Sequence, residues 1–227
     1  MSAAGGPLRT VVLISGSGSN LQAIADAAAA GRIPARVTAV LSDRPAAFGL
    51  ERATRAGIHA ECLPGDGYAS REDYDAALAE RLSALAPELV VLAGFMRILT
   101  DRLVSAWHGR MLNIHPSLLP AYRGLHTHRR VLAAGDAEHG TSVHFVTEEL
   151  DGGPIVAQAR LAILPGDDEA SLQRRIQAME HRLYPEVIGW FAEGRLRLDG
   201  ERVFLDGKPL ATPVQRREEE LLRPGAA

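Results

Sequence analysis

The chain has 227 residues, of which 46% are hydrophobic and 23% are charged. This composition is typical of a globular protein with one large or two modest domains, and it excludes a fibrous or disordered chain. The 25 basic and 28 acidic residues give a net charge of −3 with no clustered basic face, which disfavours nucleic-acid binding and favours a small-molecule partner.

Cysteine content and hydropathy bear on the compartment. The single cysteine, Cys62, excludes an intrachain disulfide and a multi-thiolate zinc site, so we expect a reducing, cytoplasmic environment. No apolar run approaches the roughly 20 residues that a membrane span requires. The first seven residues lack the features of a signal peptide. We therefore expect no membrane partner.

The N-terminal half alternates predicted strands with predicted helices. Apolar, β-branched runs predict strands, and apolar positions at helical spacing predict helices. The predicted strands are 9–14, 37–41, 58–63, 89–93 and 111–114, and the predicted helices are 21–27, 48–56 and 74–85. This alternation indicates an α/β, Rossmann-like fold with a mostly parallel central sheet flanked by helices.

The C-terminal half contains fewer predicted elements, one of which is a long helix. Residues 141–146 and 155–164 predict two strands, 129–134 predict a short helix, and 171–193 predict a long helix in which Pro185 predicts a kink or break. Residues 195–210 predict a β-hairpin that turns at an Asp-Gly pair. We expect a single domain over residues 1–210 and a charged, flexible tail over residues 211–227.

The loop at residues 16–20, after the first predicted strand, is the first candidate site. Its glycines let the backbone approach a ligand, and Ser19 and Asn20 stand at the start of a helix, where backbone amides favour an anion such as phosphate. Leu21 replaces the third glycine of a dinucleotide-binding motif, so an ordinary tight turn is an equal alternative. Asp43, after the second strand, suits either dinucleotide binding or a helix cap.

A second candidate site is the end of the strand at 111–114. Strand alternation places Asn113 and His115 on the same side, and Pro116 and Pro120 stiffen the chain that follows. This is the sheet edge where open α/β proteins bind ligands. An asparagine in a turn beside an inert histidine is the alternative, but the two prolines favour a functional site.

Asp151 is a candidate partner for the histidine. It lies in a glycine-rich loop, Glu149 to Pro154, that precedes a predicted strand. A carboxylate beside a histidine stabilises the imidazolium form, which can act as an acid near neutral pH. By itself, an Asp-Gly pair is equally an ordinary turn.

Four histidines raise the question of a metal site: His126, His128, His139 and His144. Residues two apart on a helix face different directions, and no clustered acids or thiols complete a ligand set. We therefore expect no metal.

Six segments, in order along the chain, resemble the folate-dependent formyltransferases. They are 14–24, 93–99, 113–120, 124–128, 139–146 and 150–154. The Asn-x-His-Pro-Ser-Leu-Leu-Pro run at 113–120 and the distant Asp151 are typical of formyl transfer in general. Gly-Ser-Asn at 18–20 is typical of the branch that acts on glycinamide ribonucleotide. One departure is Ala121, where many relatives carry a lysine; the nearest cation here is Arg123.

The resemblance implies an activity and a role for each matching residue. The formyl group of 10-formyltetrahydrofolate would pass directly, through a tetrahedral intermediate, to the amine of 5'-phosphoribosylglycinamide in de novo purine synthesis. The implied catalytic residues are Asn113, His115 and Asp151. The implied phosphate-binding residues are Gly18, Ser19 and Asn20, with further ribonucleotide contacts from Gln177 and Glu180. The implied folate-binding residues are Arg71, Met96, Arg97, Ile98, Leu99 and Asn113.

Other functions stay open. A formyltetrahydrofolate hydrolase carries a regulatory domain before the catalytic one, and a tRNA-directed formyltransferase carries a basic β-barrel after it; we expect neither extension. A non-catalytic, Rossmann-type nucleotide-binding module explains the glycine loop but not Asn113, His115 and Asp151. We expect a monomer or homodimer whose partners are the ribonucleotide and the reduced folate.

Overall fold

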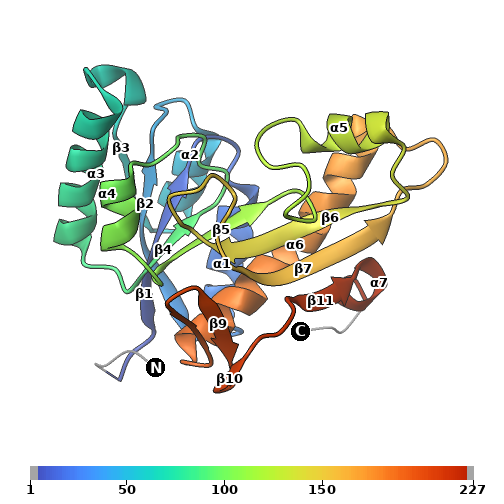
Figure 1. The fold of residues 1–227 in the computed structure, drawn as a ribbon. Helices are drawn as coiled ribbons and strands as arrows, with labels where there is room; N and C mark the ends of the chain where they lie inside the picture. Colours follow the sequence, from blue (N-terminus) through green and yellow to red (C-terminus); the bar gives the residue numbers. More distant parts are fainter. Residues whose placement is uncertain (1–4, 224–227) are drawn as a thin grey trace.

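The computed structural model describes residues 5–223 and is built on one eight-stranded sheet, in the order β11-β7-β6-β5-β4-β1-β2-β3 (Figure 1). Strands β1 to β5 pair in parallel, β6 is antiparallel to both β5 and β7, and β11 is parallel to β7. The strands are β1 (Leu8–Ile14), β2 (Ala35–Ser42), β3 (His59–Cys62), β4 (Leu89–Leu92), β5 (Met111–His115), β6 (Glu138–Phe145), β7 (Ile155–Ala162) and β11 (Val214–Arg217). The predicted α/β fold with a mostly parallel sheet is confirmed.

Helices cover both faces of this sheet. The helices are α1 (Ser19–Ala29), α2 (Phe48–Arg55), α3 (Arg71–Leu85), α4 (Asp101–Ala106), α5 (Thr127–Ala134), α6 (Glu169–Ala192) and α7 (Glu218–Leu221), with a 3₁₀ turn η1 (Gly65–Gly67). Along β1, Val12 and Ile14 pack with α1 and α6, whereas Val11 and Leu13 pack with α3 and α4 (Figure 1). Successive strand side chains point to opposite faces, so the apolar run of β1 supplies two separate cores.

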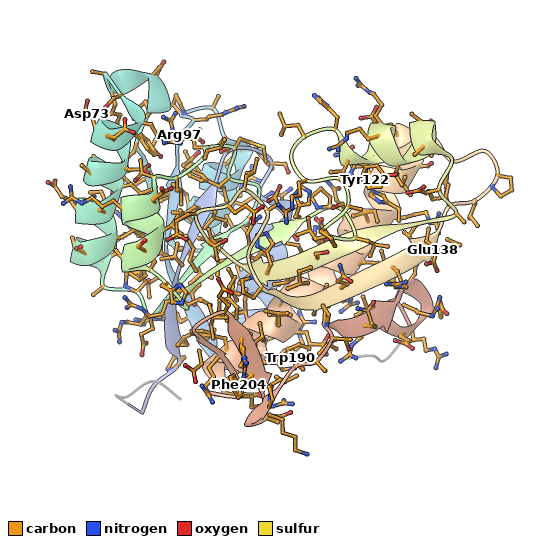
Figure 2. All side chains as sticks on the ribbon, viewed as in Figure 1. Asp73, Arg97, Tyr122, Glu138, Trp190 and Phe204 are labelled. Atoms are coloured by element: carbon orange, nitrogen blue, oxygen red, sulfur yellow. The ribbon has the colours of Figure 1, made fainter. Side chains whose placement is uncertain are left out.

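A second, smaller sheet forms where the hairpin was predicted. It consists of β8 (Leu196–Asp199), β9 (Arg202–Leu205) and β10 (Lys208–Pro209), paired antiparallel. Leu196 and Val203 join the same core as Trp190, and Figure 2 shows Trp190 and Phe204 at this end of the molecule. The predicted hairpin is confirmed and gains a third, short strand.

The helices of the structure differ from the prediction in two places. Helix α6 continues through Pro185, so the predicted break is wrong. Tyr184 and Val187, on either side, are fully buried, and this packing offsets the hydrogen bond that proline removes. Helix α4 was not predicted because it is short. Its start is marked by Thr100, whose hydroxyl accepts a hydrogen bond from the backbone N–H of Leu103.

The predicted flexible tail is wrong for residues 214–221. Strand β11 pairs with β7 from Val214 to Arg217, and the following helix α7 buries Leu221 in the core. Arg216 binds Glu186 of α6 at 2.6 Å. The sequence analysis missed this strand because it is mostly polar and lacks the apolar run by which buried strands are predicted. An edge strand can be polar because many of its side chains are exposed. The part of the predicted tail at 224–227 lies outside the described residues.

Between residues 5 and 223, no helix is both long enough and apolar enough to cross a membrane.

Candidate active site

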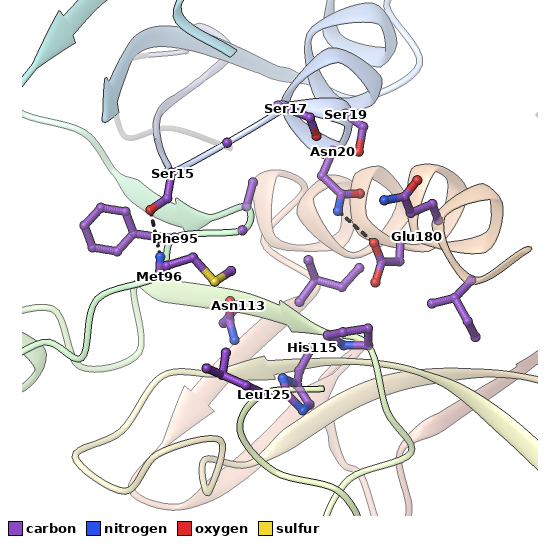
Figure 3. A pocket seen from close by; sticks show the side chains of 18 of the residues that line it. Ser15, Ser17, Ser19, Asn20, Phe95, Met96, Asn113, His115, Leu125 and Glu180 are labelled. Carbon is purple, nitrogen blue, oxygen red and sulfur yellow. Dashed lines mark hydrogen bonds between the residues drawn. The ribbon is translucent and has the colours of Figure 1, made fainter. Parts of the chain in front are cut away.

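A pocket of about 510 Å³ lies at the carboxyl ends of β1, β4 and β5. Figure 3 shows Ser19 and Asn20 on one side of this pocket and Asn113 and His115 on the other. The hydroxyl of Ser15, just after β1, accepts a hydrogen bond from the Met96 amide at 2.8 Å and so ties the ends of β1 and β4 together. Residues from three parallel strands therefore meet at the edge where the sequence predicted a site.

The loop at 16–20 folds as an anion cradle would require. Gly18 adopts a left-handed conformation with φ of 69°, and a Cβ there would lie 2.6 Å from the Gly49 backbone. Helix α1 begins directly afterwards, and no side chain caps its first turn. Its first backbone N–H groups are therefore free of a side-chain acceptor, and the helix dipole adds partial positive charge at the same place.

A buried carboxyl lies next to this loop. Glu180 of α6 accepts a hydrogen bond from Asn20 Nδ2 at 2.9 Å, and the Thr141 hydroxyl lies 3.2 Å from its other oxygen. Burial raises the pKa of Glu180, and the hydrogen bonds from Asn20 and Thr141 partly oppose that shift. Gln177, three residues earlier on α6, also lines the pocket. The structure thus places both predicted helix residues in the lining of the pocket that the loop also lines.

His115 and Asp151 lie side by side across the pocket from the loop. His115 Nδ1 is 3.5 Å from Asp151 Oδ2, and both side chains are buried. His115 Nε2 donates to the Tyr122 carbonyl at 3.0 Å, and the Gly124 amide donates to Asp151 Oδ2 at 2.9 Å. A proton on His115 Nδ1 would therefore point at the Asp151 carboxylate.

Asn113 is oriented by a histidine that the sequence did not assign to the site. Asn113 Nδ2 donates to His144 Nε2 at 3.1 Å, and His144 Nδ1 donates to the Phe145 carbonyl at 2.9 Å. Burial lowers the pKa of His144, which keeps Nε2 free to accept. The contact follows from the pairing of Asn113 with His144 between β5 and β6, a register that no sequence motif encodes.

Four exposed apolar side chains line the same pocket and form what we term the apolar rim: Met96, Ile98, Leu125 and Leu150. Met96 and Ile98 were expected in a binding site, whereas Leu125 and Leu150 were not. The signal that identifies them is structural, because each side chain is more than half exposed beside a concave site.

Of the remaining predicted folate-binding residues, one lines the pocket and two do not. Arg97 lines the pocket, with its guanidinium 4.1 Å from the centre of the Tyr74 ring. Leu99 is buried in the core under α3 and α4 and does not line the pocket. Arg71, at the start of α3, also lies outside the pocket lining and pairs with Glu72 at 3.8 Å.

The histidines considered for a metal site do not assemble one. Within residues 5–223, no group of three or more histidine, cysteine or acidic side chains is placed to hold a metal ion. His128 and His139 instead contact each other, with Nδ1 and Nε2 3.0 Å apart. Burial lowers the pKa of both, that of His139 to about 4, so one neutral ring donates to the other.

The fold and the pocket agree with the sequence comparisons. The sequence profile described as "Formyl transferase" matches residues 8–188, so this chain belongs to the formyl transferase family. The chain is 55% identical over 203 residues to the phosphoribosylglycinamide formyltransferase of Escherichia coli (strain K12), covering 89% of this chain and 96% of that protein.

Further relatives carry the same name. The phosphoribosylglycinamide formyltransferase of Haemophilus influenzae is 48% identical over 202 residues, which cover 89% of this chain and 95% of that protein. The solved structure of the Coxiella burnetii phosphoribosylglycinamide formyltransferase superposes with a TM-score of 0.89 at 51% identity, covering 92% of this chain and 99% of that one.

Proposed function

We propose that this chain is a phosphoribosylglycinamide formyltransferase of de novo purine synthesis. It transfers the formyl group of 10-formyltetrahydrofolate to the amine of 5'-phosphoribosylglycinamide and releases formylglycinamide ribonucleotide and tetrahydrofolate. One observation carries the proposal: a single pocket is lined by the loop at 18–20 on one side and by Asn113, His115 and Asp151 on the other. The relatives at 55% and 48% identity support it.

In this proposal, the loop at 18–20 holds the phosphate of the ribonucleotide. Gly18 allows the close backbone approach, and the free amides of α1 donate to the phosphate oxygens. Gln177 and Glu180 lie beside the loop, where they can contact the ribose, and Glu180 has acceptor atoms for hydroxyl groups. The anchored phosphate then fixes how far the amine reaches toward His115.

The reduced folate is the second substrate, and the apolar rim offers its flat rings a surface. Met96, Ile98, Leu125 and Leu150 expose hydrocarbon at the pocket, and Arg97 adds a cation. We propose Met96, Arg97 and Ile98, together with Asn113, as folate-binding residues. Arg71 and Leu99 stay sequence-based predictions, since neither lines the pocket.

The transfer requires both developing charges to be stabilised. The neutral amine attacks the formyl carbon, so its nitrogen becomes positive and the formyl oxygen becomes negative. The second N–H of Asn113 Nδ2 and the Nδ1–H of protonated His115, which lies 3.5 Å from Asp151 and can be shared, donate to this oxyanion. One such donor contributes about 2.7–4 kcal/mol to transition-state stabilisation. The bond from carbon to the folate nitrogen then breaks, and the product keeps the new carbon–nitrogen bond.

Asp151 faces His115 and takes part in moving the proton. Its carboxylate lies 3.5 Å from His115 Nδ1, where it can accept a hydrogen bond from this nitrogen. The proton lost by the attacking amine passes, through water next to Asp151, to the departing folate nitrogen. No residue forms a covalent bond to the formyl group, and Cys62 at the end of β3 does not line the pocket.

Amine dependence tests the proposed function. Consumption of 10-formyltetrahydrofolate is followed by absorbance with and without 5'-phosphoribosylglycinamide. Consumption only in the presence of the amine is the expected result. Consumption that is independent of the amine would indicate the hydrolase instead, and no consumption would indicate a nucleotide-binding module. The cytoplasmic location, the absence of a metal requirement and the monomeric or homodimeric state stay predictions.

A further inference from the structure

Asp151 lies on the connection between β6 and β7, and an ion pair ties this connection to the loop that follows His115. The pair joins the guanidinium of Arg123 to the carboxylate of Glu149. The pair thus joins the loop that carries Asp151 to the loop that directly follows His115, the last residue of β5.

Glu149 is folded over the turn that presents Asp151. The Gly152 amide donates to the Glu149 carbonyl at 3.0 Å, which closes the turn. A Cβ on Gly152 would lie 2.3 Å from Glu149 Oε2, so the carboxylate rests directly on the residue after Asp151. Asp151 itself has φ of 49°, in the left-handed region that few residues other than glycine, asparagine and aspartate adopt.

Arg123 lies between two backbone groups that contact the proposed catalytic pair. The preceding residue, Tyr122, accepts the hydrogen bond from His115 Nε2 at 3.0 Å, and the following residue, Gly124, donates to Asp151 Oδ2 at 2.9 Å. Arg130 donates to the Arg123 carbonyl at 2.6 Å and holds the same segment from α5. A shift of residues 122–124 would therefore move partners of both His115 and Asp151.

We propose that Arg123 and Glu149 are positioning residues that hold Asp151 against His115. The proposal rests on the proposed function for its kinetic consequence. The ion pair presses the turn at 149–152 onto the segment at 122–124, and the Gly124 amide then fixes the Asp151 carboxylate beside the imidazole. Neither Arg123 nor Glu149 lines the pocket, so each acts through the placement of Asp151.

The position of the pair predicts a small effect on folding and a larger one on turnover. Arg123 and Glu149 side chains are 37% and 66% exposed, and exposed ion pairs contribute little to stability. A misplaced catalytic carboxylate, in contrast, lowers the rate of the chemical step without weakening substrate binding.

Four variants separate these effects: Arg123→Ala, Arg123→Lys, Glu149→Gln and the double variant of Arg123→Ala with Glu149→Gln. We expect about a five- to twentyfold loss of kcat in each variant that breaks the pair, with both KM values within about twofold. Arg123→Lys should recover most of the loss, and the double variant should be no worse than Arg123→Ala. Arg195→Ala, which removes an exposed arginine from its pair with Asp206 beside the small sheet, should leave kcat unchanged.

Salt provides a second kinetic test. Raising ionic strength from about 0.05 to about 0.5 M screens an exposed pair. The kcat of the unmodified protein should therefore fall toward that of Arg123→Ala, whereas Arg123→Ala should be insensitive. A wild-type kcat in Arg123→Ala, or losses that simply multiply in the double variant, would overturn the proposal.

Hydrogen exchange tests the placement without reference to any activity. The Gly124 amide donates to Asp151, so its exchange should quicken in Arg123→Ala and Glu149→Gln and stay unchanged in Arg195→Ala. Unchanged exchange in all three variants contradicts the proposal whatever reaction the protein catalyses. A failure of amine-dependent transfer in the unmodified protein contradicts only the proposed function, and the exchange result still decides the role of the pair.

Discussion

At the residue scale, two histidines of the pocket region have different hydrogen-bond partners. His144 is a neutral acceptor because burial lowers its pKa and its Nδ1–H is used by the Phe145 carbonyl. His115 has a carboxylate at one nitrogen and a carbonyl at the other. The two histidines are thereby suited to different tasks, because His144 orients Asn113 whereas His115 faces the Asp151 carboxylate.

His139 gives a prediction for the pH dependence of folding. Its pKa falls from 6.5 to about 4 in the folded protein, chiefly through burial and secondarily through His128. The unfolded chain therefore binds this proton more tightly. The stabilising contribution is complete above about pH 6.5 and is lost as the pH falls toward 4.

We expect His139→Gln to reduce the difference in unfolding free energy between pH 7 and pH 5 by about 1–2 kcal/mol. Glutamine has no proton to gain and keeps polar atoms for His128. Urea denaturation at the two pH values measures the difference. His59→Gln is the control, because that ring is exposed. An undiminished pH effect in His139→Gln would show that other groups cause it.

At the element scale, the junction of β1 with α1 determines where a phosphate can bind. The strand ends at Ile14, Gly18 turns the chain, and α1 starts without a side-chain cap. Gly18 is required here for two reasons, a positive φ and contact with the backbone of Gly49.

Gly18→Ala should weaken ribonucleotide binding by about tenfold or more, because an added Cβ must displace α2 or the loop. Binding of the dephosphorylated nucleoside should change little. Calorimetric titration with both ligands measures the affinity gap, which should be large in the unmodified protein and small in Gly18→Ala. Gly67→Ala is the matched control, since a Cβ there meets no atom within 4 Å. Equal affinities for the two ligands in the unmodified protein would rule out a phosphate site.

Much of the site could be predicted from the sequence because its parts are local in the chain. The loop at 16–20 and the run at 113–120 each combine a strand end with polar residues, and the pocket lies where those strand ends meet. His144, Leu125 and Leu150 could not be predicted in the same way. Their roles depend on strand register and on exposure, which only the folded chain determines.

At the scale of the whole molecule, the C-terminal segment completes the sheet. The sequence predicted most strands correctly, since buried strands are apolar runs, but it missed β11, whose residues are mostly polar. The parallel pairing of β11 with β7 attaches this segment to the sheet. The ion pairs of Arg216 with Glu186 and of Arg175 with Glu218 attach it to α6. The antiparallel β6 was also not deducible, because pairing direction leaves no mark in a single strand.

Adjacent leucines test whether this segment contributes to stability. Leu221 is 7% exposed and packs in the core, whereas Leu222 is 39% exposed. We expect Leu221→Ala to lower the free energy of unfolding by about 2 kcal/mol or more and Leu222→Ala by under about 1 kcal/mol. Chemical denaturation of both variants provides the comparison. Equal, small changes in the free energy of unfolding in the two variants would mean that this segment contributes little to stability.

The central claim is that His115 and Asp151 act together on a formyl group while the loop at 18–20 holds the nucleophile. The most direct test is the steady-state rate of formyl transfer by Asp151→Asn, measured alongside its affinity for the ribonucleotide. The account predicts that kcat falls by about 10²- to 10⁴-fold while the affinity changes by no more than a few-fold. A folded Asp151→Asn protein with kcat within a few-fold of the parent would contradict it.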